Sequence, residues 1–274
     1  MKISVITINY NNREGLHKTI KSVVNQTYND FEYIIVDGGS TDGSLDVIKT
    51  YSSNITYWVS EPDNGIYHAM NKGIDVAQGE YCIFMNSGDL FYNNRVLTEI
   101  IPYLSGTDIV LGDTLESDGT IQLHKKEMTF KTLYGGSLSH QSSFIRTYLL
   151  KKYHYDESLK IVADWKFFLQ TLIFDNCSYE GVSMYISIYD VSGITYSNMD
   201  KFNEERTNVA KKMFPQRILQ DIDELLKGNT WEDKLYICIK QSKYNKLIYR
   251  LNVMILKTLS LMKKSWISTF PNSI

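Results

Sequence analysis

The first ninety residues alternate between short apolar runs and amphipathic stretches, and each apolar run is followed by a cluster of polar residues. Between the apolar runs, the amphipathic stretches have apolar side chains at helical spacing. Strands buried on both faces read as continuous apolar runs, and their alternation with helices predicts a parallel sheet with right-handed crossovers. We therefore expect an α/β fold with a mostly parallel sheet flanked by helices. The expected strands are 2–8, 31–36, 55–59 and 81–85, and the expected helices are 13–26, 45–51 and 66–77.

The polar clusters after the first two strands could bind a nucleotide. The backbone from Thr7 to Asn9 and the ring of Tyr10 could hold a base, or they could form an ordinary loop. Asp37 could accept hydrogen bonds from a base N–H or a ribose hydroxyl, and the glycines after it would let a ligand approach the backbone. The carboxylates of Asp37 and Asp42 could instead cap the next helix, and Asp42 is the better candidate for the cap. The Gly-x-Gly-x-x-Gly fingerprint of dinucleotide sites is absent.

The clusters after the third and fourth strands suit phosphate and a cation. Asp63 lies in the loop before a helix whose Lys72 could contact a diphosphate as a point charge, or could be a solvated helix lysine. The fourth strand leads into Asn86-Ser-Gly-Asp89, which could be a metal and phosphate platform or a plain turn. Open α/β sheets bind ligands at the carboxyl ends of their strands, so four such clusters at one edge favour a ligand site.

Four motifs follow one another along the chain: Val-Ile-Thr-Ile-Asn-Tyr-Asn, Ile-Ile-Val-Asp-Gly-Gly-Ser-Thr-Asp-Gly-Ser, Glu-Pro-Asp-Asn-Gly-Ile-Tyr-His-Ala-Met-Asn-Lys-Gly-Ile and Gly-Glu-Tyr-Cys-Ile-Phe-Met-Asn-Ser-Gly-Asp. In this order they resemble the family-2 glycosyltransferases, and the resemblance covers about the first 190 residues. It implies a Rossmann-like fold of the GT-A type and the transfer of a sugar from a UDP- or GDP-sugar to an acceptor hydroxyl, with inversion and with Mg2+ or Mn2+. The acceptor would be a glycan or a lipid-linked molecule in cell-surface polysaccharide or glycoconjugate synthesis.

The same resemblance implies roles for single residues. Asp37 would contact the base, and Asp89, the last residue of an Asp-x-Asp-type motif, would bind the metal. Asn86 and Gly88 stand where aspartates are common, so the diphosphate would have to supply further oxygens to the cation. Asn86 could instead touch the sugar. His140, in a His-Gln pair, could be a third metal or diphosphate ligand, an acceptor contact or a hydrogen-bonded structural histidine.

Asp164 is the candidate general base. It opens an amphipathic stretch, so it could cap a helix, take the proton from the acceptor hydroxyl, or do both. The family often has Glu-Asp here, but Ala163 replaces the first acid and leaves Asp164 to act alone. Trp165 beside it could stack on a donor or acceptor sugar or lie in the core.

The pattern becomes helical near residue 199, which predicts a catalytic domain over 1–198 and a helical extension over 199–274. Helices are expected over 201–213 and 217–227, separated at Pro215. From Trp231 onward there are eight Lys and Arg against two Asp and Glu, and 231–262 have apolar residues at helical spacing. Such a basic helix could lie on an anionic membrane, pack on the catalytic domain or form a homodimer. It lacks the uncharged stretch of about 18 residues that a membrane span needs.

Composition narrows the range of functions and cellular locations that remain possible. A net charge of −2 argues against nucleic-acid binding. Three scattered cysteines without a Cys-x-x-Cys pair, and a chain that starts directly in a strand, predict a cytoplasmic protein or one peripheral to the inner face of the membrane. A sugar nucleotidyltransferase would need a glycine-rich, basic phosphate loop, which residues 9–13 do not provide. A non-catalytic module that binds a nucleotide sugar is the other alternative.

Overall fold

The computed structural model describes residues 2–136, 138–191 and 198–226. The chain forms two compact units, Met1–Met213 and Phe214–Ile274. The site residues predicted from the sequence all belong to the first unit. The predicted basic helix over 231–262 lies outside the described residues.

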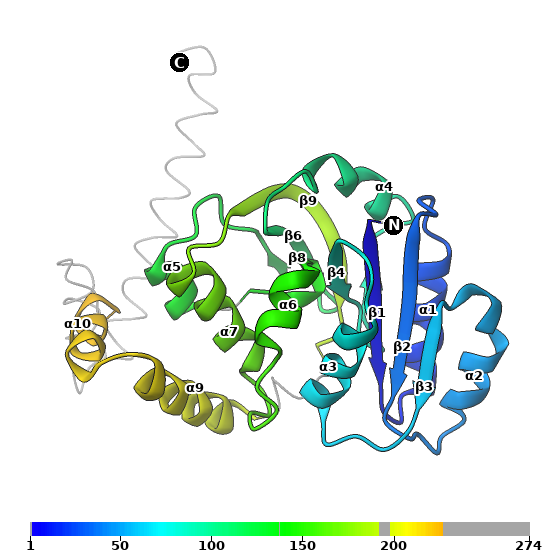
Figure 1. Ribbon diagram of the computed structural model, residues 1–274, viewed down its shortest axis with the longest axis horizontal. Coiled ribbons are helices and arrows are strands. Elements are labelled where there is room, and N and C mark those ends of the chain that lie inside the picture. The colour runs from blue at the N-terminus through cyan, green and yellow to red at the C-terminus, as the bar shows by residue number, and fades with distance from the viewer. Residues whose placement is uncertain (1, 137, 192–197, 227–274) are drawn as a thin grey trace, which may run out of the picture. The chain divides into compact units, whose positions relative to one another are not determined.

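The first half of the sheet is parallel throughout, as the alternation of strands and helices predicts (Figure 1). Its strands lie in the order β3-β2-β1-β4, and the third begins two residues later than expected because a 3-10 turn covers Ser52–Asn54. The strands are β1 (Ile3–Asn9), β2 (Phe31–Asp37), β3 (Tyr57–Ser60) and β4 (Tyr81–Phe84). The helices between them are α1 (Arg13–Val24), α2 (Ser44–Thr50) and α3 (Ile66–Val76).

Helices cover both faces of the central strands, which is why these strands are mostly apolar and deeply buried. Every residue of β1 and β4 is buried. On one face of β1, Val5 packs in a cluster with Leu16 and Ile20 of α1. On the other face, Ile6 lies so close to α3 that a Cβ on Gly73 would be 2.6 Å from its Cγ2. The sheet therefore presents a ligand only with its strand ends.

The second half of the sheet continues β4-β8-β6-β9-β5, with β7 beside β6. Here β8 is antiparallel to both neighbours, whereas β9 is parallel to β6. The strands are β5 (Leu90–Phe91), β6 (Ile109–Glu116), β7 (Ile121–Gln122), β8 (Ser143–Arg146) and β9 (Tyr179–Tyr189). The helices are α4 (Val96–Ile100), α5 (Phe130–Gly135), α6 (Thr147–Tyr153), α7 (Ala163–Phe168) and α9 (Met199–Met213), with 3-10 turns at Ile101–Tyr103 and His140–Ser142 and a π turn at Leu169–Phe174.

The α/β fold class expected from the sequence is confirmed. Strands β6 and β7 pair as an antiparallel hairpin. The long strand β9 was not predicted. The sequence placed the start of the helical extension at 199, but α9 belongs to the first compact unit. The second unit begins with α10 (Gln216–Leu226), which follows Pro215. Among the described residues, no helix is long and apolar enough to cross a membrane.

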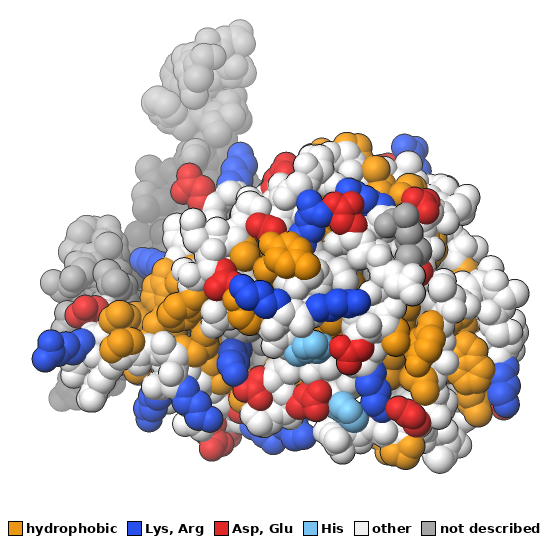
Figure 2. Space-filling view, viewed as in Figure 1, with side chains coloured by type: hydrophobic (Ala, Val, Ile, Leu, Met, Phe, Trp, Pro, Cys, Tyr) orange, Lys and Arg blue, Asp and Glu red, His pale blue; other side chains and the backbone are white. Residues whose placement is uncertain are grey.

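Figure 2 shows Lys and Arg side chains interspersed with Asp and Glu over the face that carries α6. Several charged side chains of the unit are paired, among them Lys2 and Arg146 with the same carboxylate, Glu80. Exposed pairs of this kind contribute about 0–1 kcal/mol each, so the apolar core rather than the surface charge stabilises the unit.

Candidate functional site

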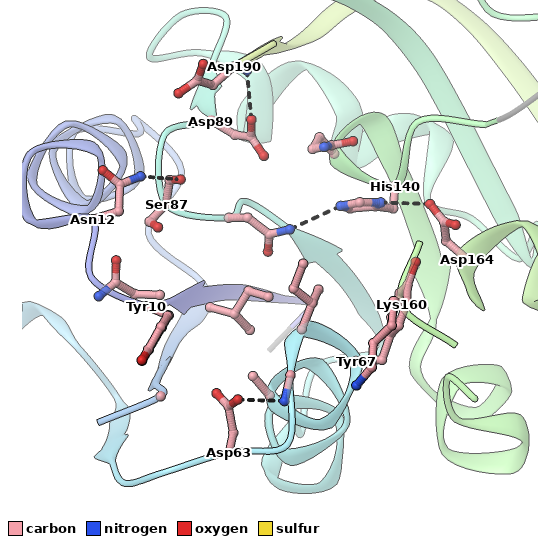
Figure 3. A pocket seen from close by; sticks show the side chains of 18 of the residues that line it. Tyr10, Asn12, Asp63, Tyr67, Ser87, Asp89, His140, Lys160, Asp164 and Asp190 are labelled. Carbon is pink, nitrogen blue, oxygen red and sulfur yellow. Dashed lines mark hydrogen bonds and ion pairs between the residues drawn. The ribbon is translucent and has the colours of Figure 1, made fainter. Parts of the chain in front are cut away.

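A cavity of about 910 Å³ opens at the carboxyl ends of β1, β2 and β4 (Figure 3). The first turn of α3, the turn at His140–Ser142, the first turn of α7 and the end of β9 complete its walls. In Figure 3, Asp89 and Asp190 lie on one side, His140 and Asp164 on another, and Tyr10 and Asp63 on a third. Residues that are far apart in the chain therefore meet where an α/β sheet binds its ligands.

The strand tips of β1 and β3 provide three of the predicted nucleotide-binding residues. Tyr10 lines the cavity with 67% of its surface exposed, and its ring lies against Gly38, where an added Cβ would be 3.2 Å from it. Asp63 lines the cavity, and its Oδ1 accepts the Gly65 N–H at 2.8 Å. Asn9 lines it too, and its buried Oδ1 has no hydrogen-bond partner. A buried acceptor without a donor is costly, so Asn9 is prepared for an N–H or O–H from a ligand.

Asp37 and Thr7 lie beneath the cavity instead of lining it. Asp37 is fully buried and accepts hydrogen bonds from Asn9 Nδ2 at 2.7 Å and from the hydroxyls of Ser40 and Ser60. Burial raises the pKa of Asp37, but these donors outweigh it and hold the pKa below its ordinary value. Thr7 is buried and donates to the Met85 carbonyl at 2.7 Å. Both residues join strand ends, and Asp37 acts on the cavity through Asn9.

Two other predicted contacts are not at the cavity. Lys72 pairs with Glu61 at 2.7 Å, and it does not line the cavity. Trp165 is 2% exposed, and its Nε1 donates to the Leu133 carbonyl at 3.0 Å, so it has the core role that the sequence left open rather than the sugar contact. The guanidinium of Arg206, from α9, covers its ring at 4.4 Å from the centroid.

Lys160, which was not predicted from the sequence, also lines the cavity. Its Nζ donates to the Asn64 carbonyl at 3.3 Å, in the loop that precedes α3. Glu205 of α9 holds the segment from behind, because its carboxylate accepts the backbone N–H groups of Lys160 and Ile161, each at 2.9 Å. No helical or strand periodicity marks this segment, so its place at the cavity could not be predicted from the sequence.

Asp89 and Asp190 form the acidic side of the cavity. Asp89 follows Gly88, whose φ of 110° favours glycine, and its Oδ1 accepts the Asp190 N–H at 3.0 Å. Burial raises the pKa of Asp89 to about 6, against the lowering effect of that N–H. Asp190 was not predicted from the sequence, although it directly follows a strand, β9. Val182, Met184, Ile186 and Ile188 alternate along β9, and this period of two could have revealed the strand.

These two carboxylates fit a divalent cation that a ligand helps to bind. Among the described residues there is no group of three or more His, Cys, Asp and Glu side chains that could hold a metal alone. Carboxylate oxygens are nevertheless the donors that Mg2+ and Mn2+ prefer, and a diphosphate would supply the rest. The buried, destabilised charge of Asp89 would be relieved by a cation beside it.

His140 lies between Asn86 and Asp164. Its Nε2 is 3.1 Å from Asn86 Nδ2, and its Nδ1 is 3.2 Å from Asp164 Oδ2. Both ring nitrogens are therefore engaged, and neither offers a lone pair to a metal in this arrangement. Asp164 lies in the first turn of α7, where Val162 holds the cap position, and its Oδ1 accepts the Trp165 N–H at 2.8 Å. The predicted capping role of Asp164 is thus not observed.

Comparisons with known proteins agree with this architecture. Residues 4–163 match the family model of glycosyl transferase family 2. The chain is 33% identical over 201 residues to the uncharacterized glycosyltransferase Rv1514c of Mycobacterium tuberculosis, which covers 70% of this chain and 76% of that protein.

Two solved structures share the fold. S. aureus TarS 1-349 in complex with UDP-GlcNAc has a TM-score of 0.60 and 23% identity over 69% of this chain and 58% of that one. The chain spans 42% of the longer TarS structure. The mannosyltransferase PcManGT from Pyrobaculum calidifontis, in complex with GDP-Man and Mn2+, has a TM-score of 0.53 and 15% identity over 69% of this chain and 56% of that one. The protein is a glycosyltransferase with a GT-A fold, and it belongs to glycosyl transferase family 2.

Proposed function

We propose that this enzyme transfers a sugar from a nucleoside diphosphate sugar to an acceptor hydroxyl, with inversion at the anomeric carbon. The observation that carries the proposal is that Asp89 and Asp164 line one cavity from different sides. A leaving diphosphate needs its developing charge neutralised, and an attacking alcohol needs a base on the opposite face. One cavity with an acid on each side can meet both needs in a single displacement.

The nucleotide is proposed to bind at the tips of β1 and β3. The exposed ring of Tyr10 offers a face for a base to stack on, and Asn9 Oδ1 offers a buried acceptor for a base N–H. Asp63, which lines the cavity, would accept a hydrogen bond from a ribose hydroxyl. The likeness to TarS with UDP-GlcNAc and to PcManGT with GDP-Man supports a UDP- or GDP-sugar as the donor.

In the reaction, the acceptor oxygen attacks the anomeric carbon while the bond from that carbon to the phosphate oxygen breaks. The nucleoside diphosphate leaves with the electron pair, and the acceptor proton passes to Asp164. Asp89 and Asp190 would hold a divalent cation, Mg2+ or Mn2+, which when bound supplies neutralisation of the diphosphate charge. Lys160 would add a fixed positive charge at the cavity, the role that the sequence analysis gave to Lys72.

The test is a panel of UDP- and GDP-sugars with Mg2+ or Mn2+, with release of the nucleoside diphosphate as the readout. We expect one donor to be hydrolysed slowly and transferred faster when an acceptor is present. Lys160→Met should raise the KM for that donor about tenfold, whereas Lys72→Met should change it less than about twofold. Tight donor binding without release of the diphosphate under any condition would overturn the proposal in favour of a non-catalytic binding module.

We further propose a glycan or lipid-linked acceptor, reached at the inner face of a membrane through the basic segment 231–262. The eight Lys and Arg that follow residue 230 support this proposal, because such segments bind anionic lipid. The full chain should sediment with vesicles that contain anionic lipid and not with neutral vesicles. Reversing the charge of Lys240, Lys243 and Lys246 should abolish the sedimentation. Unchanged sedimentation, or a dimer in solution without vesicle binding, would contradict the membrane role.

A further inference from the structure

The imidazole of His140 is fixed in place from three sides. Its Nε2 faces Asn86 and its Nδ1 faces Asp164, at 3.1 Å and 3.2 Å. Phe84 of β4 packs against the ring in a T-shaped contact, with the centroids 6.3 Å apart and the planes at 86°. The ring therefore has one orientation, in which each nitrogen has a single partner.

The partners decide which nitrogen carries the proton. A carboxylate can only accept, so Asp164 requires an N–H at Nδ1. A neutral imidazole has one N–H, so its Nε2 must then accept a hydrogen bond. The Asn86 amide supplies the donor through Nδ2, which an aspartate at this position could not do. The resemblance to the family expects an aspartate at 86, and the hydrogen-bond requirement of His140 gives a physical reason for the asparagine here.

We infer that Asn86 holds His140 as the neutral Nδ1–H tautomer, so that His140 positions Asp164 and does not bind the cation. The inference rests on the proposed function for the role of Asp164 as the base. An aspartate at 86 would instead keep both ring nitrogens protonated, with an imidazolium between two carboxylates. Asp164 would then be held in an ion pair and would be a weaker acceptor for the proton of the incoming alcohol.

The surroundings of the amide oxygen of Asn86, Oδ1, bear on this orientation. With Nδ2 turned to His140, the buried Oδ1 has no hydrogen-bond partner. Leaving a buried acceptor unpaired is unfavourable, so the orientation is determined by His140 rather than by Asn86 itself. The amide nitrogen of Asn86 is thus committed to the histidine.

The tautomer can be observed directly by NMR in the ligand-free, full-length protein labelled with 15N-histidine. At pH 8, we expect the His140 Nδ1 signal of a protonated nitrogen and the Nε2 signal of an unprotonated one. In Asn86→Asp, both signals should be those of an imidazolium. The spectrum of His140→Gln identifies the His140 signals by their loss. His124, which pairs with Asp113 away from the cavity, is the internal control and should not change in Asn86→Asp. An Nε2–H tautomer or an imidazolium in the unmodified protein overturns the inference.

A double-mutant cycle tests whether Asn86 acts through His140. Asn86→Asp should lower kcat about tenfold in the unmodified protein but less than about twofold in a His140→Gln background. Equal losses in both backgrounds would show that Asn86 acts on the sugar alone and would overturn the inference. The two measurements also separate the hypotheses. If no donor is turned over, the proposed function fails while the NMR result still decides the tautomer.

Discussion

Three histidines of the described first unit lie beside an aspartate, His154 beside Asp75 at the surface and two others in less exposed positions. The two less exposed pairs differ in their surroundings. In both, Nδ1 of the imidazole lies beside a carboxylate oxygen, at 2.7 Å for His124 with Asp113 and at 3.2 Å for His140 with Asp164. The side chains of the first pair are 9% and 8% exposed, and those of the second are 16% and 15% exposed. Only the second pair lines the cavity.

The pair of His124 and Asp113, which we call the sealed pair, joins two segments of backbone. Asp113 lies inside β6, and its Oδ1 accepts both the backbone N–H and the Nδ1–H of His124, just after β7. The pair of His140 and Asp164, which we call the open pair, has a different set of partners. His140 also contacts Asn86, and both members of the pair line the cavity. A histidine beside an aspartate therefore does not identify a site. The second partner of the ring and the space beside the pair do.

The largest expected difference between the pairs is in turnover. Asp164→Asn should lower kcat by about 10²–10⁴-fold, the contribution of a positioned general base, and should leave donor binding close to normal. Asp113→Asn should leave kcat per folded molecule within about twofold, because Asp113 does not line the cavity. Steady-state kinetics with titrated active enzyme measures both variants. Wild-type transfer by Asp164→Asn would end the assignment of the base.

For stability we expect the opposite order: a substitution in the sealed pair should cost more free energy of unfolding than one in the open pair. Asp113→Asn should lower the free energy of unfolding by about 1–3 kcal/mol, because it disturbs a buried acceptor shared by two N–H groups. Asp164→Asn should cost less, since water can reach the cavity and replace a lost partner. Urea unfolding of both variants, followed by circular dichroism, gives the two values. A larger loss for Asp164→Asn would mean that the open pair is the structural one.

The strand ends could be predicted from the sequence, but the segments that cover them could not. The apolar runs before Asn9, Asp37 and Asp89 are local signals. Asn9 and Asp37 are the last residues of β1 and β2, and Asp89 lies in the turn that follows β4. That Asp37 is buried could not be predicted, because one of its donors is Ser60, 23 positions away on another strand. The strand-tip signal also cannot separate Asp113 from the others, since β6 continues past it to Glu116.

The second half of the cavity depends on pairings between distant segments. His140 meets Asn86 across 54 positions and Asp164 across 24, and no periodicity in the sequence records either contact. Antiparallel β8 and the parallel return of β9 bring these segments together, and neither pairing follows from alternation of strand and helix. The residue types were therefore identifiable as candidates, but their partners were not.

The histidines should differ by a smaller factor than the aspartates. His140→Gln should lower kcat about tenfold, because Asp164 loses the group that orients it while keeping its own ability to accept a proton. His124→Gln should leave kcat within about twofold and lower the urea midpoint instead. A kcat loss in His124→Gln as large as that in His140→Gln would show that the sealed pair is coupled to the cavity.

The smallest expected effect concerns how each pair is supported. The sealed pair is held by β6 itself, whereas the segment before Asp164 is held from α9 by the Glu205 carboxylate, which accepts the N–H groups of Lys160 and Ile161. Charge-assisted hydrogen bonds are about twice as strong as neutral ones, so Glu205→Gln should weaken this support without removing it. We expect the KM for the donor to rise about threefold, with Glu204→Gln, its exposed neighbour on α9, unchanged. Because His124 and Asp113 make no contact with Glu205, the NMR signals of His124 should be the same in both variants, while those of His140 should shift in Glu205→Gln alone. A shift of the His124 signals would mean that α9 stabilises the whole unit rather than the cavity wall.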